Sequence, residues 1–142
     1  RSYDYKIHNH QVRSSLNANY YLWEPRSLNI DEMRKAANFL IGEHDFSCFR
    51  GRLCQAKSPV KTVEYLDILE SDDNLIVKIK ANAFLHHMVR NIVGTLLKVG
   101  RGEKNAEWML SVLESKDRRE AGPTAEPQGL YFIKAYYPKP LN

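Results

Sequence analysis

The sequence predicts an α+β fold with helices packed on one face of a largely antiparallel, mixed sheet. Three observations support this class. Apolar and polar side chains alternate with period two in an opening segment and in later runs, as is typical of strands. Apolar side chains recur with the helical period in three other segments. These helical segments are segregated from the strands, an arrangement that favours helices gathered on one face of the sheet.

The first part of the chain is expected to hold one strand, one loop and one helix. Residues 3–8 alternate between apolar and polar side chains, which predicts a strand with one buried face. Residues 9–28 mix asparagine, serine and aromatic residues without a period, so a loop is expected there. A capping box that begins at Asn29 predicts a helix over 30–40, and Gly42 supplies a C-cap.

A hairpin and a long helix are expected next. The β-rich runs 63–69 and 75–79 are separated by the turn-forming cluster 71–74, which predicts an antiparallel hairpin. Apolar side chains then cover most of a helix predicted over 84–99, so this helix must be buried on most sides. Gly94 lies inside it and costs roughly 1 kcal/mol relative to alanine, which is tolerable if another backbone approaches closely.

The last part is expected to hold a short helix and a final strand. A helix is predicted over 106–114, followed by a charged, solvated stretch at 116–119. After a turn-rich segment, residues 130–137 are expected to form a strand. By local pattern alone, Tyr3 and Leu130 are ordinary buried strand residues.

Composition indicates one globular domain. The 142 residues are 43% hydrophobic, which is enough for a core of their own, and the net charge of +4 makes an anionic partner plausible. No run of about 18 uncharged apolar residues occurs, so no membrane span is expected. Cys48 and Cys54 match neither a disulfide scaffold nor zinc-ligand spacing, and a reducing cytoplasm fits them best.

The predicted long helix carries polar groups that a buried helix normally avoids. Adjacent His86 and His87 suggest a metal site, but neighbours on a helix point about 100° apart, and no further ligand accompanies them, so no metal is expected. Arg90 cannot lose its charge and therefore needs a carboxylate or a phosphate. A structural ion pair with Asp45 or Asp67 and a functional pair remain equally open.

Two basic clusters could follow the phosphates of a nucleic acid. The first precedes the hairpin and comprises Arg50, Arg52, Lys57 and Lys61. The second follows the long helix and comprises Lys98, Arg101 and Lys104. For each cluster taken singly, a solvated face is the favoured interpretation, because that is the commoner meaning of a charge run.

Four ordered segments resemble the TruA-type tRNA pseudouridine synthases, which modify uridines in the anticodon stem-loop. The longest is ANAFLHHMVRNIVG at residues 81–94. The others are RSYDY at 1–5 with Asn9-His10, GEHDFS at 42–47 with Phe49-Arg50, and AGPTA at 121–125 with Gly-Leu-Tyr at 129–131. A match of this length with ordered companions covers essentially the whole chain and is far more specific than a lone short motif.

The resemblance implies that residues 1–142 are the C-terminal catalytic-cleft domain, one of two related halves of the family fold. In the family, the essential aspartate lies upstream in an Arg-Thr-Asp motif, which does not occur in these residues. The chain is therefore expected to be inactive alone and to need the N-terminal half. The family further implies a homodimer that binds tRNA, no cofactor and no metal.

The resemblance also assigns roles to single residues. Tyr3 matches the tyrosine that stacks on the target base and assists proton transfer. Arg90 matches the basic residue that pairs with the catalytic aspartate, and Leu130 matches the apolar residue that packs against the uracil. Arg50, Arg52 and Lys57 are expected to contact RNA, whereas no role is assigned to His86 or His87. Two alternatives to an enzyme remain, a stand-alone RNA-binding domain and a dimerisation half.

Overall fold

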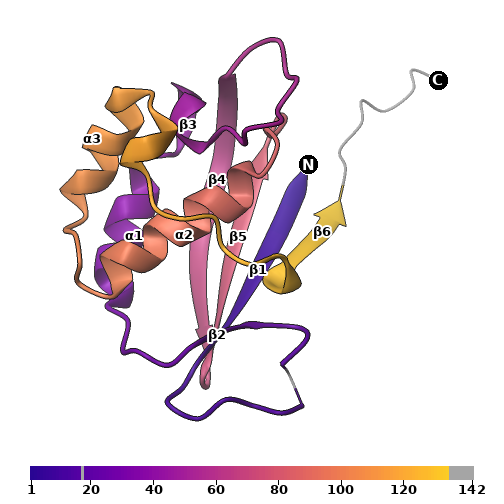
Figure 1. Ribbon diagram of the computed structural model, residues 1–142, viewed down its shortest axis with the longest axis vertical. Helices are drawn as coiled ribbons and strands as arrows, with labels where there is room; N and C mark the ends of the chain where they lie inside the picture. Colours follow the sequence, from indigo (N-terminus) through magenta and orange to yellow (C-terminus); the bar gives the residue numbers. More distant parts are fainter. Residues whose placement is uncertain (17, 135–142) are drawn as a thin grey trace.

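The computed structural model describes residues 1–16 and 18–134, and within them six strands form one sheet (Figure 1). The strands are β1 (Ser2–Asn9), β2 (Leu22–Glu24), β3 (Gly42–Asp45), β4 (Val60–Ser71), β5 (Asn74–Ala81) and β6 (Leu130–Lys134). The α-helices are α1 (Ile30–Asn38), α2 (Met88–Gly100) and α3 (Glu107–Ser115). Short 3₁₀ turns lie at Ser47–Phe49, Arg118–Glu120 and Pro127–Gly129.

The sheet has the order β2-β1-β5-β4-β3, and β6 also pairs with β1. Among the described strands, only β2 runs parallel to its partner, and the other pairings are antiparallel. The helices lie together on one face of the sheet (Figure 1). The predicted α+β class and the helix-covered face are therefore confirmed.

The core lies between that face and α2. Strand β5 buries every second side chain, from Leu75 to Ala81, as the alternation of its sequence predicts. Helix α2 is buried on nearly all sides because β-strands lie beneath it and α1 packs beside it. Among the described residues, no helix has both the length and the apolar character needed to cross a bilayer.

Two short strands were not anticipated. Strand β2 lies inside the expected loop 9–28, and β3 follows α1 directly. The expectation that Gly42 caps the first helix was wrong, because α1 ends at Asn38 and Gly42 instead opens β3 with a φ of +102°. The predicted N-cap is confirmed, since the Asn29 side chain accepts a hydrogen bond from the Glu32 amide at 3.1 Å.

The long helix begins later than expected. Helix α2 starts at Met88, whereas residues 84–87 form an extended stretch and a turn. His87 ends this turn in the left-handed region, with a φ of 60°. The two histidines therefore precede the helix, so the expectation that they point about 100° apart as helical neighbours was wrong.

The end of the chain agrees in part with expectation. Helix α3 and strand β6 are confirmed, and β6 is described as far as Lys134, so residues 135–137 of the expected strand lie outside the described residues. The stretch 116–119 is not uniformly solvated. Arg118 is half-buried, and burial lowers its pKa.

Candidate functional site

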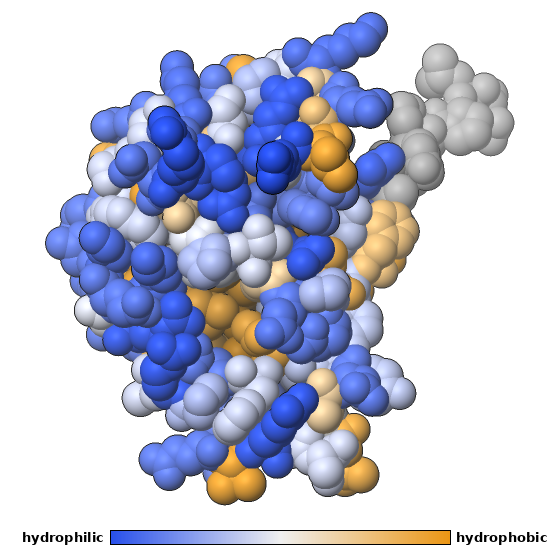
Figure 2. Space-filling model, viewed as in Figure 1, coloured by the Kyte–Doolittle hydropathy of each residue, from blue (hydrophilic) through white to orange (hydrophobic). Residues whose placement is uncertain are grey.

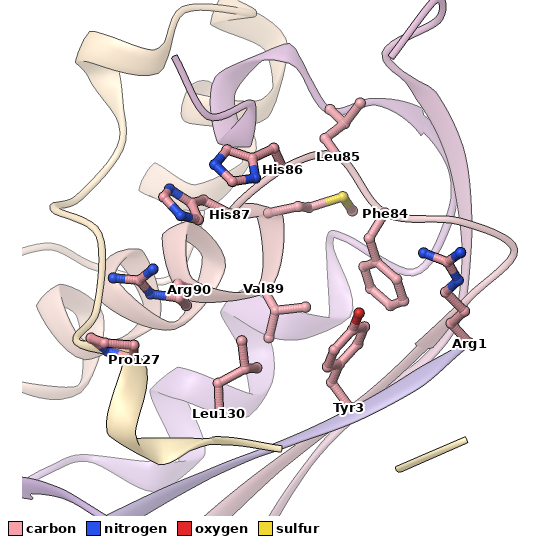
Figure 3. Close-up of a pocket in the computed structure, with 11 residues that line it drawn as sticks. Arg1, Tyr3, Phe84, Leu85, His86, His87, Val89, Arg90, Pro127 and Leu130 are labelled. Atoms are coloured by element: carbon pink, nitrogen blue, oxygen red, sulfur yellow. The ribbon is translucent and has the colours of Figure 1, made fainter. Parts of the chain in front are cut away.

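A pocket of about 320 Å³ lies between β1, the start of α2 and β6 (Figure 3). Its lining residues include Tyr3, Arg90 and Leu130, to which the resemblance assigns roles. The other lining residues are Arg1, Phe84, Leu85, His86, His87, Met88, Val89 and Pro127. Within the described part of the chain, the lining thus holds two guanidinium groups and no carboxylate.

Tyr3 is held in place by two aromatic neighbours. Its ring meets Phe84 edge-on at 5.0 Å between centroids and Phe132 at 5.5 Å, a geometry that aromatic pairs favour. Phe132 is its direct partner across the β1–β6 pairing. The Tyr3 hydroxyl points into the pocket (Figure 3), and it has no hydrogen-bond partner among residues 1–16 and 18–134.

Leu130 is placed by a close contact between the chain and β1. A Cβ atom at Gly129 would lie 2.7 Å from the Lys6 carbonyl oxygen, so only glycine lets this turn sit against the strand. The Tyr5 hydroxyl donates to the Glu126 carbonyl oxygen at 2.5 Å, and burial raises the pKa of Tyr5. These contacts fix the start of β6, where Leu130 pairs with Tyr5.

Arg90 is anchored by one side of its guanidinium. Its Nε donates to the Ala125 carbonyl oxygen at 2.7 Å, and the Ala125 amide donates to the Arg90 carbonyl oxygen at 3.0 Å. No carboxylate of the described residues lies within ion-pair distance, so the alternative of a structural pair with Asp45 or Asp67 was wrong. The terminal nitrogens of Arg90 therefore remain available to an anion.

Residues 121–126, here called the crossing segment, pass directly over α2. A Cβ atom at Gly94 would overlap the Pro123 carbonyl oxygen, and one at Gly122 would lie 2.8 Å from the Gly94 carbonyl oxygen. The two backbones thus touch at both glycines, as the sequence suggested for Gly94. The Gly122 amide also donates to the Thr95 hydroxyl at 2.9 Å.

A buried polar network fastens the crossing segment and explains the asparagine beside Arg90. Asn91 donates through Nδ2 to the Phe49 carbonyl oxygen at 2.8 Å. Its Oδ1 accepts from the Thr124 hydroxyl at 2.6 Å and from Arg118 at 3.0 Å. Every polar atom of the asparagine is used, which is the condition for burying it. Local patterns gave no sign of this network.

His86 and His87 form a stacked pair at the rim of the pocket. Their ring centroids are 3.8 Å apart with an angle of 26° between the planes, and both residues are exposed. Burial, together with the charges of His86 and Arg90, lowers the pKa of His87. No group of three potential metal ligands occurs among residues 1–16 and 18–134.

The basic residues differ in what they contact. Arg50 donates to the Ala56 carbonyl oxygen at 2.6 Å and so braces its own loop, whereas Arg52 and Lys57 are exposed. In the second cluster, Arg101 is half-buried and pairs with Glu24 at 3.0 Å and with Glu103 at 2.6 Å. Only part of each predicted cluster is therefore a free cationic surface.

Comparison with known proteins identifies relatives along nearly all of the chain. A family model described as tRNA pseudouridine synthase matches residues 36–138. The chain is 49% identical over 138 residues to tRNA pseudouridine synthase A of Pseudomonas aeruginosa, covering 97% of this chain and 48% of that protein. It is 50% identical over 139 residues to the protein of the same name from Hydrogenovibrio crunogenus, covering 98% and 53%. The chain thus spans about half the length of the curated relatives it matches.

Proposed function

Since the chain belongs to the tRNA pseudouridine synthase family, we propose that it forms one side of a cleft where uridine in a tRNA anticodon stem-loop is isomerised to pseudouridine. The observation that carries this proposal is the pocket, in which Tyr3, Arg90 and Leu130 meet without a lining carboxylate. The missing acid is proposed to come from the half of the relatives that this chain does not match.

The reaction explains why these side chains belong together. Isomerisation breaks the bond between C1′ and N1 of uridine, turns the uracil, joins C1′ to C5, and moves the C5 proton away while N1 regains one. A carboxylate must act at the sugar or the base while the detached uracil is held. Tyr3 and Leu130 would hold the ring by stacking and packing, and the free side of Arg90 would keep the carboxylate ionised and oriented.

The edge of the sheet supports the upstream half as a partner. Strand β6 pairs only with β1 among the described strands, so its other edge is open. Apolar side chains reach the surface along this edge (Figure 2), where Phe132 and Ile133 are 56% and 52% exposed. An exposed apolar edge next to a half-built pocket is a surface that a partner would cover.

A homodimer and a cytoplasmic location complete the proposal. The described cysteines fit a reducing compartment, because Cys48 and Cys54 are unpaired. Sedimentation at several concentrations tests the dimer, and a concentration-independent monomer of the complete enzyme would contradict it.

The first experiment measures tritium release from tRNA labelled at uridine C5. We expect no release with this chain alone and release when the upstream half is added, because only then does the pocket receive a carboxylate. Release by the chain alone would mean that a carboxylate within these residues does the chemistry. The proposed role of Arg90 would then be wrong.

A second experiment addresses the free hydroxyl of Tyr3. In the complete enzyme, Tyr3→Phe is expected to lower kcat about 10²-fold with little change in KM, the low end of the range for assisted proton transfer. The phenyl ring preserves the contacts with Phe84 and Phe132 and the stacking on the base. Steady-state kinetics with Tyr3→Leu as the ring-free comparison separates the two roles. If Tyr3→Phe retained the wild-type kcat, the hydroxyl would have no role in proton transfer, and only the ring of Tyr3 would be functional.

A further inference from the structure

The two histidines of the pocket rim have no role in the chemistry described above. His86 and His87 lie beside Arg90 on one side of the pocket, and Tyr3 and Phe84 lie on the other (Figure 3). A base held between these sides has neighbours in the RNA chain, and those neighbours must leave the pocket over its rim. The histidines therefore lie where an adjacent nucleotide would pass.

The pair is built so that one imidazole supports the other. Gly51 lies against His86, because a Cβ atom there would be 2.6 Å from the His86 carbonyl oxygen and 2.9 Å from its ring carbon Cδ2. His87 stacks on the ring of His86 and remains exposed. Its backbone lies in the left-handed region with a φ of 60°, which is costly for most residues but better tolerated by histidine, asparagine and aspartate. An imidazole supported in this way offers a flat face to a nucleobase.

A basic loop is attached directly to the same histidines. Residues 50–57, here called the basic loop, are held by the Gly51 amide, which donates to the His86 carbonyl oxygen at 2.7 Å. The His86 amide in turn donates to Cys54 Sγ at 3.4 Å. Arg52 and Lys57 project from this loop as exposed cations. A flat aromatic face beside free cations is the combination that binds single-stranded nucleic acid.

We propose that His87, supported by His86, stacks on the base next to the target uridine, while the basic loop contacts the adjoining phosphates. This inference rests on the proposed function and deepens it by assigning a binding site to the flanking nucleotide. The lowered pKa of His87 agrees with it, because a neutral imidazole can leave water for a stacked contact at lower cost.

The test uses the complete enzyme and a synthetic anticodon stem-loop RNA. His87→Asn keeps a residue that tolerates the left-handed backbone but removes the aromatic face. We expect it to raise the Kd for the RNA about tenfold, within the range measured for stacking of one base. His87→Phe restores an aromatic face and should bind within about twofold of wild type, and His10→Asn, at an exposed histidine that does not line the pocket, should bind as wild type does.

A second RNA series separates stacking from a structural role. Two stem-loops carry an abasic residue on the 5′ or the 3′ side of the target uridine. On one of them, wild type and His87→Asn should bind equally, and that RNA identifies the stacked neighbour. Equal binding of the two proteins to the intact RNA would overturn the inference, as would a tenfold loss that persists on both abasic RNAs.

The two proposals fail in different ways. Absence of tritium release by the complete wild-type enzyme would contradict the proposed function whatever the binding data show. Normal release together with an unaltered Kd for His87→Asn would contradict only the stacking site. Thermal unfolding of each variant shows whether any loss of binding reflects loss of folded protein.

Discussion

Replacing Arg90 with leucine in the complete enzyme is expected to lower kcat by about 10²–10³-fold, the loss typical of removing one preorganised group that stabilises charge at a reacting centre. The terminal nitrogens of Arg90 have no acidic partner among the described residues, while its Nε is fixed by the Ala125 carbonyl oxygen. The side chain is thus positioned before any carboxylate arrives. Steady-state kinetics and tRNA binding are measured on the same preparations, and binding should change much less than kcat.

Two comparison variants make this result specific. Lys98→Leu removes a cation from the same helix but outside the pocket, and it should retain wild-type kcat. Arg90→Lys retains the charge but loses the planar guanidinium that can hold Ala125 and a carboxylate together, so an intermediate kcat is expected. Near-normal turnover of Arg90→Leu would contradict the assignment of this site. An equal loss of kcat in Lys98→Leu would show that kcat depends on the overall charge of the protein and not on the position of Arg90.

The second large effect is expected at the contact between α2 and the crossing segment. Gly94→Ala should lower the free energy of unfolding by about 3 kcal/mol, the upper part of the range for overpacking. Helix propensity alone predicts the opposite sign, since alanine is favoured over glycine in a helix interior by about 1 kcal/mol. The reason for the destabilisation is that the new methyl group would overlap the Pro123 carbonyl oxygen, and two backbones must separate to admit it.

Urea unfolding of this chain measures the effect, and Gly100→Ala provides the matched control. Both glycines lie on α2 and are buried, but a Cβ atom at Gly100 would meet side-chain atoms of Met33 and Leu28 rather than backbone, and side chains can adjust by rotation. We expect Gly100→Ala to be clearly the milder of the two. If Gly94→Ala stabilised the protein, the crossing segment would have to move away from α2 at little cost. The close contact of Ala125 with Arg90 would then not be rigidly held.

Several elements of the fold could be predicted from the sequence because their signals are local. Strand β1, the hairpin of β4 and β5, and helices α1 and α3 each carry a periodic pattern within one short segment. The cap at Asn29 depends only on a side chain and an amide three residues away. Tyr3, Arg90 and Leu130 were identified as site residues because they match motif positions of the family, and their roles remain proposals.

Other features are decided only by contacts between distant segments. Strands β2 and β3 are too short to show a period, and they exist because β1 and β4 offer them hydrogen-bond partners. The run 84–87 has the apolar spacing of a helix, yet it is held out of α2 by its bonds to the basic loop. That Arg90 has no ion pair within residues 1–16 and 18–134 also could not be predicted, since it depends on where Asp45 and Asp67 lie after folding.

The sequence by itself therefore determined the fold class, the principal elements and the family of this protein, because periodicity, capping and motif matches are properties of neighbouring residues. Only the tertiary structure brought Tyr3, Arg90 and Leu130 to one pocket and set His87 over His86 at its rim. The physical reason is that Arg90 and Leu130 depend on backbone contacts at Gly94, Gly122 and Gly129, and His86 on one at Gly51, where segments distant in sequence approach too closely for any side chain.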